Sequence, residues 1–309
     1  MQRATFDSLR QLFSSVGDRV TLVDVSARDG LQAEPVVLSP PERAAWLRRI
    51  LESGVPEAEA GSFVDPRRLP QMARTEEVLA ELPDLAERLW VLVPNRRGVE
   101  RARKAGARNL VLLLSATETH SEANLGRPIA SVLEELGPMA RTAAEAGLRA
   151  RLAVSMAWID PVEGKVPAGR VGTLCRRARE LGIEELTLCD TYGGASPRDV
   201  ASLLEDVSAV YPLSAVSLHL HDTFGVAAAN ALTGLLAGVR RFDGSVGGLG
   251  GCPFAPGSRG NVPIEDLSYL FESIGAATGV DGDALRRARS ECLNLLNLRR
   301  HGTLEPGGT

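Results

Sequence analysis

The chain has 309 residues, which is enough for two average domains or for one large α/β barrel. Hydrophobic residues make up 44% and charged residues 24% of the sequence, a composition that excludes a disordered protein or a coiled coil. The net charge of -4 argues against a general nucleic-acid binder, and no apolar run reaches the roughly 18 residues of a membrane span. The four cysteines are scattered and the N-terminus has no apolar signal segment, so we expect a reduced, cytoplasmic protein.

Short apolar runs that predict β-strands alternate along the chain with Ala- and Arg-rich segments that predict helices. The strand-like runs are 20–26, 57–64, 88–94, 109–116, 149–158, 185–190, 215–222 and 242–249. The helix-like segments include 42–53, 99–105, 131–146, 168–181, 197–210 and 227–237. Alternation of this kind indicates parallel strands joined by right-handed crossovers, and eight units fit a closed (β/α)₈ TIM barrel.

The barrel accounts for the whole chain as a single domain, with a short helix over residues 1–18 before it and a frayed tail over 301–309. The alternative fold is an open, doubly wound sheet. That fold normally shows a glycine-rich fingerprint after its first strand, where this chain has Ala27, Arg28, Asp29 and Gly30.

Functional side chains of a barrel lie at the carboxyl ends of its strands, so the residues after each run are the candidates. Arg28 and Asp29 follow the first run, Glu59 lies in the second, and Asp190 ends the sixth. Taken singly, each has an ordinary structural explanation: an ion pair at the barrel mouth for the first three, and a helix cap for Asp190.

The seventh run carries the strongest signal, the sequence His219-Leu220-His221. Side chains alternate across a strand, so the two imidazoles share one face. They are two of only four histidines in the chain. A pair of this spacing near a strand end favours a metal site over two buried core histidines.

A glycine-rich segment, 247–261, follows the eighth run and contains Cys252 near its centre and Asn261 at its end. Glycines allow a loop to move and to approach a ligand closely. A lone loop cysteine in a chain without disulfides is a candidate reactive thiol, although a plain flexible loop is the simpler interpretation.

Together these motifs resemble the hydroxymethylglutaryl-CoA lyase family of metal-dependent TIM-barrel enzymes. The resemblance extends from about residue 20 to residue 293. Its motifs are Arg28-Asp29-Gly30-Leu31-Gln32, Glu59 with Ser62-Phe63-Val64, Pro94-Asn95, Asp190-Thr191, His219 to Thr223, and Gly250-Gly251-Cys252-Pro253 with Gly260-Asn261. Several motifs in one order are far more specific than any one of them.

The resemblance implies a divalent metal held by Asp29, His219, His221 and Asn261. A mixed set of imidazole, carboxylate and amide ligands suits Mg²⁺ or Mn²⁺ best, with Zn²⁺ or Co²⁺ as alternatives. The metal polarises the substrate hydroxyl and holds its distal carboxylate.

The remaining roles implied by the resemblance concern the breaking of the carbon–carbon bond. Arg28 stabilises the thioester enolate, Cys252 transfers a proton at the product carbon, and Gln32 lies near the substrate. Glu59 and Asp190 belong to the acid–base network. The base that takes the hydroxyl proton is either Asp190 or the cluster around Asp29; the sequence does not choose.

The implied reaction is the cleavage of 3-hydroxy-3-methylglutaryl-CoA to acetyl-CoA and acetoacetate. The implied partners are an acyl-CoA substrate and further copies of the chain, in a homodimer or a larger homo-oligomer, without nucleic acid or membrane. Two departures bear on the acyl group: residues 154–161 lack the Gly-Cys-Pro-Tyr stretch usual in the family, and His120 replaces an aromatic residue. A lyase for a related 3-hydroxyacyl thioester is therefore an alternative.

Two other activities of this fold are weaker alternatives. A Claisen-type synthase of the 2-isopropylmalate or homocitrate kind usually adds a regulatory domain, but fewer than 50 residues follow Asn261, about one helix and a tail. A biotin carboxyltransferase needs a lysine in the barrel. The two lysines are Lys104, in a predicted helix, and Lys165, in a predicted loop.

Overall fold

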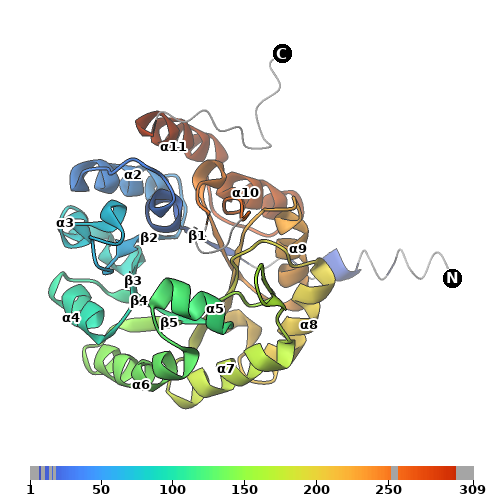
Figure 1. The fold of residues 1–309 in the computed structure, drawn as a ribbon. Helices are drawn as coiled ribbons and strands as arrows, with labels where there is room; N and C mark the ends of the chain where they lie inside the picture. The colour runs from blue at the N-terminus through green and yellow to red at the C-terminus, as the bar shows by residue number, and fades with distance from the viewer. Residues whose placement is uncertain (1–6, 8–10, 14–15, 17–18, 252–256, 297–309) are drawn as a thin grey trace.

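The structure, a computed structural model, describes residues 7, 11–13, 16, 19–251 and 257–296. Eight parallel strands close into a barrel in the order β1-β10-β9-β8-β5-β4-β3-β2, with a ring of helices outside it (Figure 1). The barrel strands are β1 (Thr21–Asp24), β2 (Glu57–Ser62), β3 (Leu89–Val93), β4 (Asn109–Ser115), β5 (Arg149–Ser155), β8 (Glu185–Asp190), β9 (Val216–Leu220) and β10 (Arg241–Gly244). The predicted TIM barrel is confirmed.

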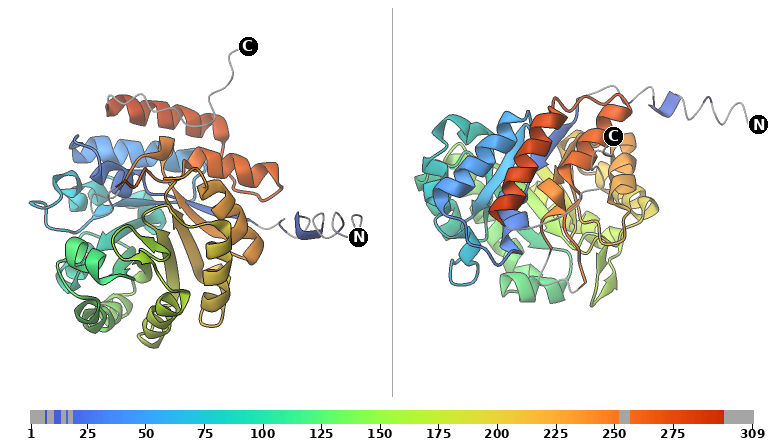
Figure 2. Two further views of the ribbon diagram at one scale, coloured as in Figure 1. Left: turned by 45° about the vertical axis from the view of Figure 1, so that its right-hand side comes forward. Right: turned by 90° about the horizontal axis from the view of Figure 1, so that it is seen from above.

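Each barrel strand is followed by a helix that covers the outside of the sheet. These helices are α2 (Pro40–Glu52), α3 (Thr75–Ala80), α4 (Arg96–Lys104), α6 (Ile129–Glu145), α7 (Ala168–Glu180), α8 (Pro197–Ser208), α9 (Ala227–Ala237) and α10 (Ile264–Ser273). The segment after Asn261 forms a second helix as well, α11 (Gly282–Leu295), which packs against α2 and α10 (Figure 2). The expectation of about one helix there was wrong.

Local sequence signals explain where the helices begin and end. Ser196 caps α8: its hydroxyl accepts from the Asp199 N–H while the Asp199 carboxylate accepts from the Ser196 N–H, and Pro197 occupies the first turn. At the other end of the helices, Gly106 and Gly147 follow α4 and α6 with φ of 82° and 68°. That left-handed conformation is easy only for glycine, so these residues stop the helices as the sequence predicts.

Two hydrophobic clusters lie on the two sides of the sheet. The larger one fills the space between the strands and the helices. The smaller one lies inside the barrel and consists of Trp90, Leu92, Val111, Ala153 and Cys189. The barrel interior also holds buried charged residues near the carboxyl ends of the strands.

Two predicted runs extend furthest past the carboxyl ends of the strands that form. β5 ends at Ser155 because Met156 adopts a left-handed conformation with φ of 55°. The chain then forms an antiparallel hairpin of β6 (Ile159–Asp160) and β7 (Gly164–Lys165), so Lys165 lies in a short strand and not in a loop. β10 ends at Gly244, and Val246–Gly248 forms a 3₁₀ turn with Gly247 at φ of 59°.

The predictions for the two chain ends concern residues that lie mostly outside the described part of the chain. Of the helix expected over 1–18, residues 7 and 11–13 are helical, and the remainder lies almost wholly outside the described residues. The tail expected over 301–309 also lies outside them. None of the helices in the described part of the chain has both the length and the apolar character needed to cross a bilayer.

Candidate active site

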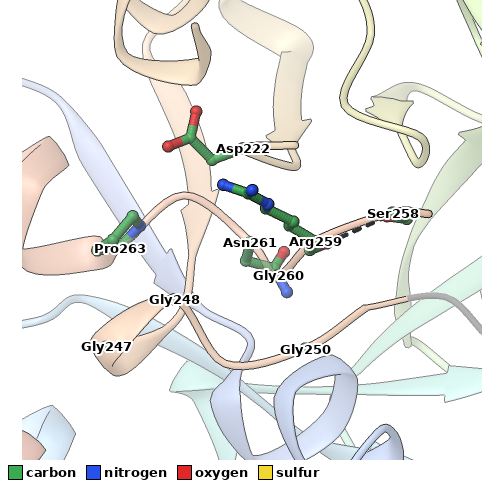
Figure 3. Close-up of a pocket in the computed structure, with 9 residues that line it drawn as sticks. All are labelled: Asp222, Gly247, Gly248, Gly250, Ser258, Arg259, Gly260, Asn261 and Pro263. Atoms are coloured by element: carbon green, nitrogen blue, oxygen red, sulfur yellow. Dashed lines mark hydrogen bonds between the residues drawn. The ribbon is translucent and has the colours of Figure 1, made fainter. Parts of the chain in front are cut away.

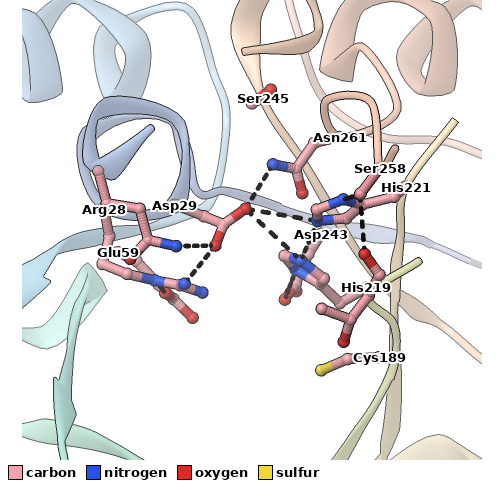
Figure 4. Close-up of polar contacts among 12 residues, drawn as sticks. Arg28, Asp29, Glu59, Cys189, His219, His221, Asp243, Ser245, Ser258 and Asn261 are labelled. Carbon is pink, nitrogen blue, oxygen red and sulfur yellow. Dashed lines mark hydrogen bonds and ion pairs between the residues drawn. The ribbon is translucent and has the colours of Figure 1, made fainter. Parts of the chain in front are cut away.

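The chain leaves β1 through a single π-helical turn, η1 (Ser26–Gly30), which carries Arg28 and Asp29. The Gly30 N–H donates to the carbonyl of Val25, five residues back, at 3.1 Å. Single π turns are rare and occur mostly at functional sites. Here the turn directs Asp29 towards two imidazole rings and sets Arg28 beside Glu59 (Figure 4).

His219 and His221 face the same side of β9 and its continuation, as the alternation predicts, and are 5% and 2% exposed. His221 Nδ1 lies 3.0 Å from the carbonyl of Arg259, which can only accept, so this nitrogen carries the hydrogen. His219 Nδ1 lies 3.3 Å from a carboxylate oxygen of Asp243 and donates to it. In the neutral rings both Nε2 atoms are therefore left with lone pairs.

Asn261 completes the cluster from the far end of the glycine-rich segment. Its Nδ2 donates to Asp29 Oδ2 at 2.7 Å and to the Leu249 carbonyl at 3.0 Å. Backbone pairing fixes the segment, because the Val262 N–H donates to the carbonyl of Leu220 at 2.9 Å. Asn261 is 2% exposed, and its Oδ1 has no hydrogen-bond partner among the described residues.

These four side chains fit a metal ion. Ligand atoms of Asp29, His219 and His221 lie within 4.8 Å of one another. The two Nε2 atoms approach to 3.3 Å, although both present lone pairs, and the buried Oδ1 of Asn261 lacks a donor. Buried acceptors that converge without hydrogens are stabilised by a cation. The structure thus brings together all four residues predicted as metal ligands.

Asp29 is held as a carboxylate. Its Oδ1 accepts from Arg28 Nη1 at 2.6 Å and from Gln32 Nε2 at 2.7 Å. Burial raises the pKa of Asp29, but the positive charge of Arg28 opposes this effect, and the pKa of Asp29 lies well below its ordinary value. An ionised carboxylate is what a metal ligand requires.

Arg28 is fixed on both sides. Besides the contact with Asp29, its Nε donates to Oε2 of Glu59, which is 1% exposed. Two carboxylates on one guanidinium leave it a single orientation. The structure therefore places the predicted residues Arg28, Glu59 and Gln32 in one connected group with Asp29.

Asp190 is buried at the end of β8, and its carboxylate is engaged by the backbone. It accepts from the N–H groups of Gly193, Gly194 and Ala195 at 3.0–3.2 Å. Burial raises its pKa, although these hydrogen bonds lower it in part. The geometry shows a residue that holds the loop before α8, close to the capping explanation. Its role in proton transfer stays a prediction.

Cys252 lies outside the described residues, so its role also stays a prediction. Gly250, just before it, passes directly over the metal-site residues. A Cβ at Gly250 would lie 2.5 Å from Asn261 Nδ2 and 3.2 Å from Asp29 Oδ2, and its φ is 116°. Only glycine allows the backbone to approach this closely.

A pocket of about 520 Å³ opens beside the cluster (Figure 3). It is bounded by the end of β9 and by the glycine-rich segment. The lining residues are Asp222, Gly247, Gly248, Gly250, Ser258, Arg259, Gly260, Asn261 and Pro263. This volume is in the range of small-molecule sites, and Asn261 joins the pocket to the metal ligands.

The sequence interpretation missed two residues of the site, Arg151 and Asp243. Asp243 orients His219, and Arg151 donates to Glu59 at 2.6 Å. Burial raises the pKa of Asp243, but the charge of Arg151 and the hydrogen bond from His219 lower it below the ordinary value. The sequence did carry a signal for both residues: each is a charged residue within an apolar run, at a position that faces the barrel interior.

The two departures from the family pattern lie close together in the structure. His120 Nδ1 lies 3.1 Å from Ser115 Oγ, and Thr117 Oγ1 donates to Asp160 Oδ2 at 2.6 Å. All four residues are buried at the carboxyl ends of β4 and β5. Burial lowers the pKa of His120 to about 4, so it is a neutral polar group where the family commonly has an aromatic ring.

Comparison with known proteins agrees with this geometry. The HMGL-like family model matches residues 19–291. Hydroxymethylglutaryl-CoA lyase of Pseudomonas mevalonii is 42% identical over 267 residues, which are 86% of this chain and 89% of the relative. (R)-citramalyl-CoA lyase of Chloroflexus aurantiacus is 40% identical over 279 residues, 87% of this chain and 88% of the relative.

Among solved structures, an HMG-CoA lyase from Acinetobacter baumannii in complex with coenzyme A and 3-methylmalate superposes with a TM-score of 0.86. It is 33% identical, and the match covers 94% of this chain and 99% of that one. With a family match over most of its length and relatives of 42% and 40% identity, this chain belongs to the HMGL-like family.

Proposed function

We propose that the protein is a carbon–carbon lyase that cleaves 3-hydroxy-3-methylglutaryl-CoA to acetyl-CoA and acetoacetate with a divalent metal. One observation carries the proposal: three buried acceptors, the Nε2 atoms of His219 and His221 and the Oδ1 of Asn261, converge beside an ionised Asp29. The relatives named as hydroxymethylglutaryl-CoA lyase support the substrate. An alternative as a Claisen-type synthase is not favoured.

Asp29, His219, His221 and Asn261 would hold the ion. The donor set of nitrogen and oxygen atoms suits Mg²⁺ or Mn²⁺, with Zn²⁺ or Co²⁺ as alternatives. When bound, the ion supplies Lewis-acid chemistry that lowers the pKa of the substrate hydroxyl and holds the distal carboxylate. The low pKa of Asp29 suits it to be a ligand and makes it a weak proton acceptor.

The other residues of the site act on the carbon–carbon bond that breaks. A base removes the tertiary hydroxyl proton, the carbon–carbon bond breaks, and its electron pair passes into the thioester enolate. The Arg28 guanidinium, fixed by Glu59 and Asp29, stabilises the enolate oxygen. Asp190, with its raised pKa, is the better matched base, and Cys252 returns a proton to the enolate carbon.

The partners follow from this chemistry. The substrate is an acyl-CoA thioester, and the pocket beside Asn261 offers room and the polar side chain of Arg259 to a thioester arm. The solved relative with coenzyme A supports this class of ligand. The homo-oligomer and the cytoplasmic location stay predictions.

A second candidate is the cleavage of a related 3-hydroxyacyl-CoA such as (R)-citramalyl-CoA. The polar group of Ser115, Thr117, His120 and Asp160 favours it, because His120 and the stretch 154–161, which contains Asp160, depart from the usual family pattern. The relative named as a citramalyl-CoA lyase is nearly as similar as the hydroxymethylglutaryl-CoA lyase.

The test is a panel of the two thioesters with Mg²⁺ or Mn²⁺, with and without EDTA, and with acetyl-CoA as the measured product. We expect metal-dependent release of acetyl-CoA with acetoacetate from the first substrate. Release from citramalyl-CoA alone assigns the second candidate. Free thiol from acetyl-CoA and a 2-keto acid, without cleavage of either thioester, would refute the lyase.

A further inference from the structure

A single buried guanidinium lies between the two halves of the site. Arg151, on the inner face of β5, is 1% exposed. Its Nη2 donates to Oε1 of Glu59 at 2.6 Å, and its Nη1 lies 3.6 Å from Oδ1 of Asp243. These two carboxylates come from β2 and β10, which flank β1 and lie across the barrel from β5.

The second oxygen of each carboxylate holds a residue of the site. Glu59 Oε2 accepts from Nε of Arg28, and Asp243 Oδ2 lies 3.3 Å from Nδ1 of His219 (Figure 4). The contacts therefore run in the order Arg28, Glu59, Arg151, Asp243, His219. One end of this series is the group that stabilises the enolate, and the other end is a metal ligand.

Arg151 has little else to bind. Among the described residues its Nε and Nη1 have no hydrogen-bond partner, and its guanidinium lies 4.7 Å from the centre of the Trp90 ring. Glu59 and Asp243 are 1% and 2% exposed, so water cannot stabilise their charges. Buried carboxylates of this kind persist only beside a cation.

We propose that Arg151 is a positioning residue: it compensates Glu59 and Asp243 together and so fixes Arg28 and His219 in one arrangement. It acts through these residues and does not touch the substrate. The turnover measurement that tests this inference rests on the proposed function, whereas the metal-binding measurement does not.

The test compares Arg151→Met with the wild type by Mn²⁺ titration, followed by the loss of the free-ion EPR signal, and by steady-state cleavage of hydroxymethylglutaryl-CoA. Residues that orient metal ligands typically change affinity or activity by about 10- to 100-fold. We expect Mn²⁺ affinity to fall at least tenfold through His219. We expect kcat to fall about 100-fold through Arg28, with KM changed less than threefold, because the lost interaction acts at the transition state.

Arg149→Met is the control for lost stacking on Trp90 and one lost ion pair. Arg149 lies on the same face of the same strand, 5.0 Å from the Trp90 ring centre, and pairs with Glu185 at 2.8 Å, but its side chain is 49% exposed where that of Arg151 is 1% exposed. Its substitution removes the same stacking and one ion pair but leaves Glu59 and Asp243 untouched. We expect Mn²⁺ affinity and kcat within about twofold of the wild type. An equal loss in both variants would reduce Arg151 to a structural role and overturn the inference.

Arg151→Lys keeps a positive charge and carries the test if Arg151→Met does not fold by circular dichroism. One ammonium cannot donate to both carboxylates at once, so we expect Mn²⁺ affinity or kcat to fall about tenfold. Wild-type values for both, in either folded variant, would overturn the inference. If the wild type binds Mn²⁺ and cleaves no thioester, the proposed function fails, and the Mn²⁺ titrations still decide the role of Arg151.

Discussion

Two groups of polar and charged residues lie inside the barrel, at opposite ends of the strands. The lower layer, at the amino ends, consists of Glu57, Trp90, Arg149, Glu185 and Arg241. The upper layer, at the carboxyl ends, consists of Arg28, Asp29, His219, His221 and Asn261. The lower layer is partly open to solvent, with the Arg149 side chain 49% exposed, whereas His219 and His221 are almost wholly buried, and only the upper layer has the features of an active site.

The difference lies in how completely the groups are paired. In the lower layer Glu57 Oε2 accepts from Trp90 Nε1 and from Arg241 Nη1, both at 2.6 Å, and Arg149 pairs with Glu185. In the upper layer the Nδ1 atoms of both histidines and the Asn261 amide nitrogen have acceptors, but among the described residues the acceptors on His219, His221 and Asn261 remain without donors. Charge inside a barrel therefore does not mark a site; an excess of acceptors does.

The largest expected effect comes from removing a ligand of the upper layer. His219→Ala takes away one Nε2 acceptor, so we expect Mn²⁺ affinity and kcat/KM to fall by more than about 100-fold. The measurements are an EPR titration and acetyl-CoA release. His120→Ala is the control for Mn²⁺ affinity, because His120 is equally buried but pairs with Ser115 and lies outside the metal-ligand cluster. Wild-type Mn²⁺ affinity in His219→Ala would contradict the assignment of the metal to this site.

A substitution that adds one methyl group to the upper layer comes next. In Gly250→Ala the new Cβ displaces Asn261, so we expect at least a tenfold loss of Mn²⁺ affinity as well as lower stability. Gly257→Ala separates the two effects, since Gly257 has φ of 86° but nothing within 4 Å of its Cβ position. Both variants pay about 1–2 kcal/mol of backbone strain. Equal Mn²⁺ affinity in the two would show that the close approach is unimportant.

The same comparison shows how much of the fold and of the site could be predicted from the sequence. The eight strands follow from apolar runs with glycine stops, and the face shared by His219 and His221 follows from their spacing alone. Arg151 and Asp243 could be placed on the inner face in the same way. Their contacts could not, because they depend on how the barrel closes across strands far apart in the sequence.

The hairpin after β5 was missed for a local reason. Met156 adopts a left-handed conformation that the sequence usually signals with glycine or asparagine. The Met156 N–H donates to Thr191 Oγ1 at 3.1 Å, a contact from a distant loop that stabilises this conformation. No pattern within residues 149–165 contains that information.

A smaller effect concerns Asp24, which contrasts with Asp29 five residues later. Asp24 accepts from Ser26 alone, and burial raises its pKa to about 7, whereas Arg28 keeps the pKa of Asp29 low. Because the folded pKa is raised, the native state binds the extra proton, and stability falls as pH rises from about 4 to about 7. Relative to the wild type, Asp24→Asn should gain about 2 kcal/mol of unfolding free energy between pH 5 and pH 8.

Urea unfolding of both proteins across that range measures the difference. Burial also raises the pKa of Glu265 to about 7, and its charge contributes to the raised pKa of Asp24, so the difference between the two proteins includes this interaction. A constant difference between the two unfolding curves would contradict the raised pKa of Asp24.

The smallest expected effect on turnover comes from a substitution in the lower layer. Trp90→Phe removes the N–H that Glu57 accepts, but Arg241 still pairs with that carboxylate. We expect a loss of about 1–2 kcal/mol in unfolding free energy and kcat/KM within about twofold of the wild type. The Trp90 ring also touches the guanidinium of Arg151, so this variant shows whether the two layers are coupled. Turnover that falls while Mn²⁺ affinity holds would mean that the lower layer supports Arg28 through Arg151 and Glu59. The division into a paired layer for stability and an acceptor-rich layer for chemistry would then be wrong.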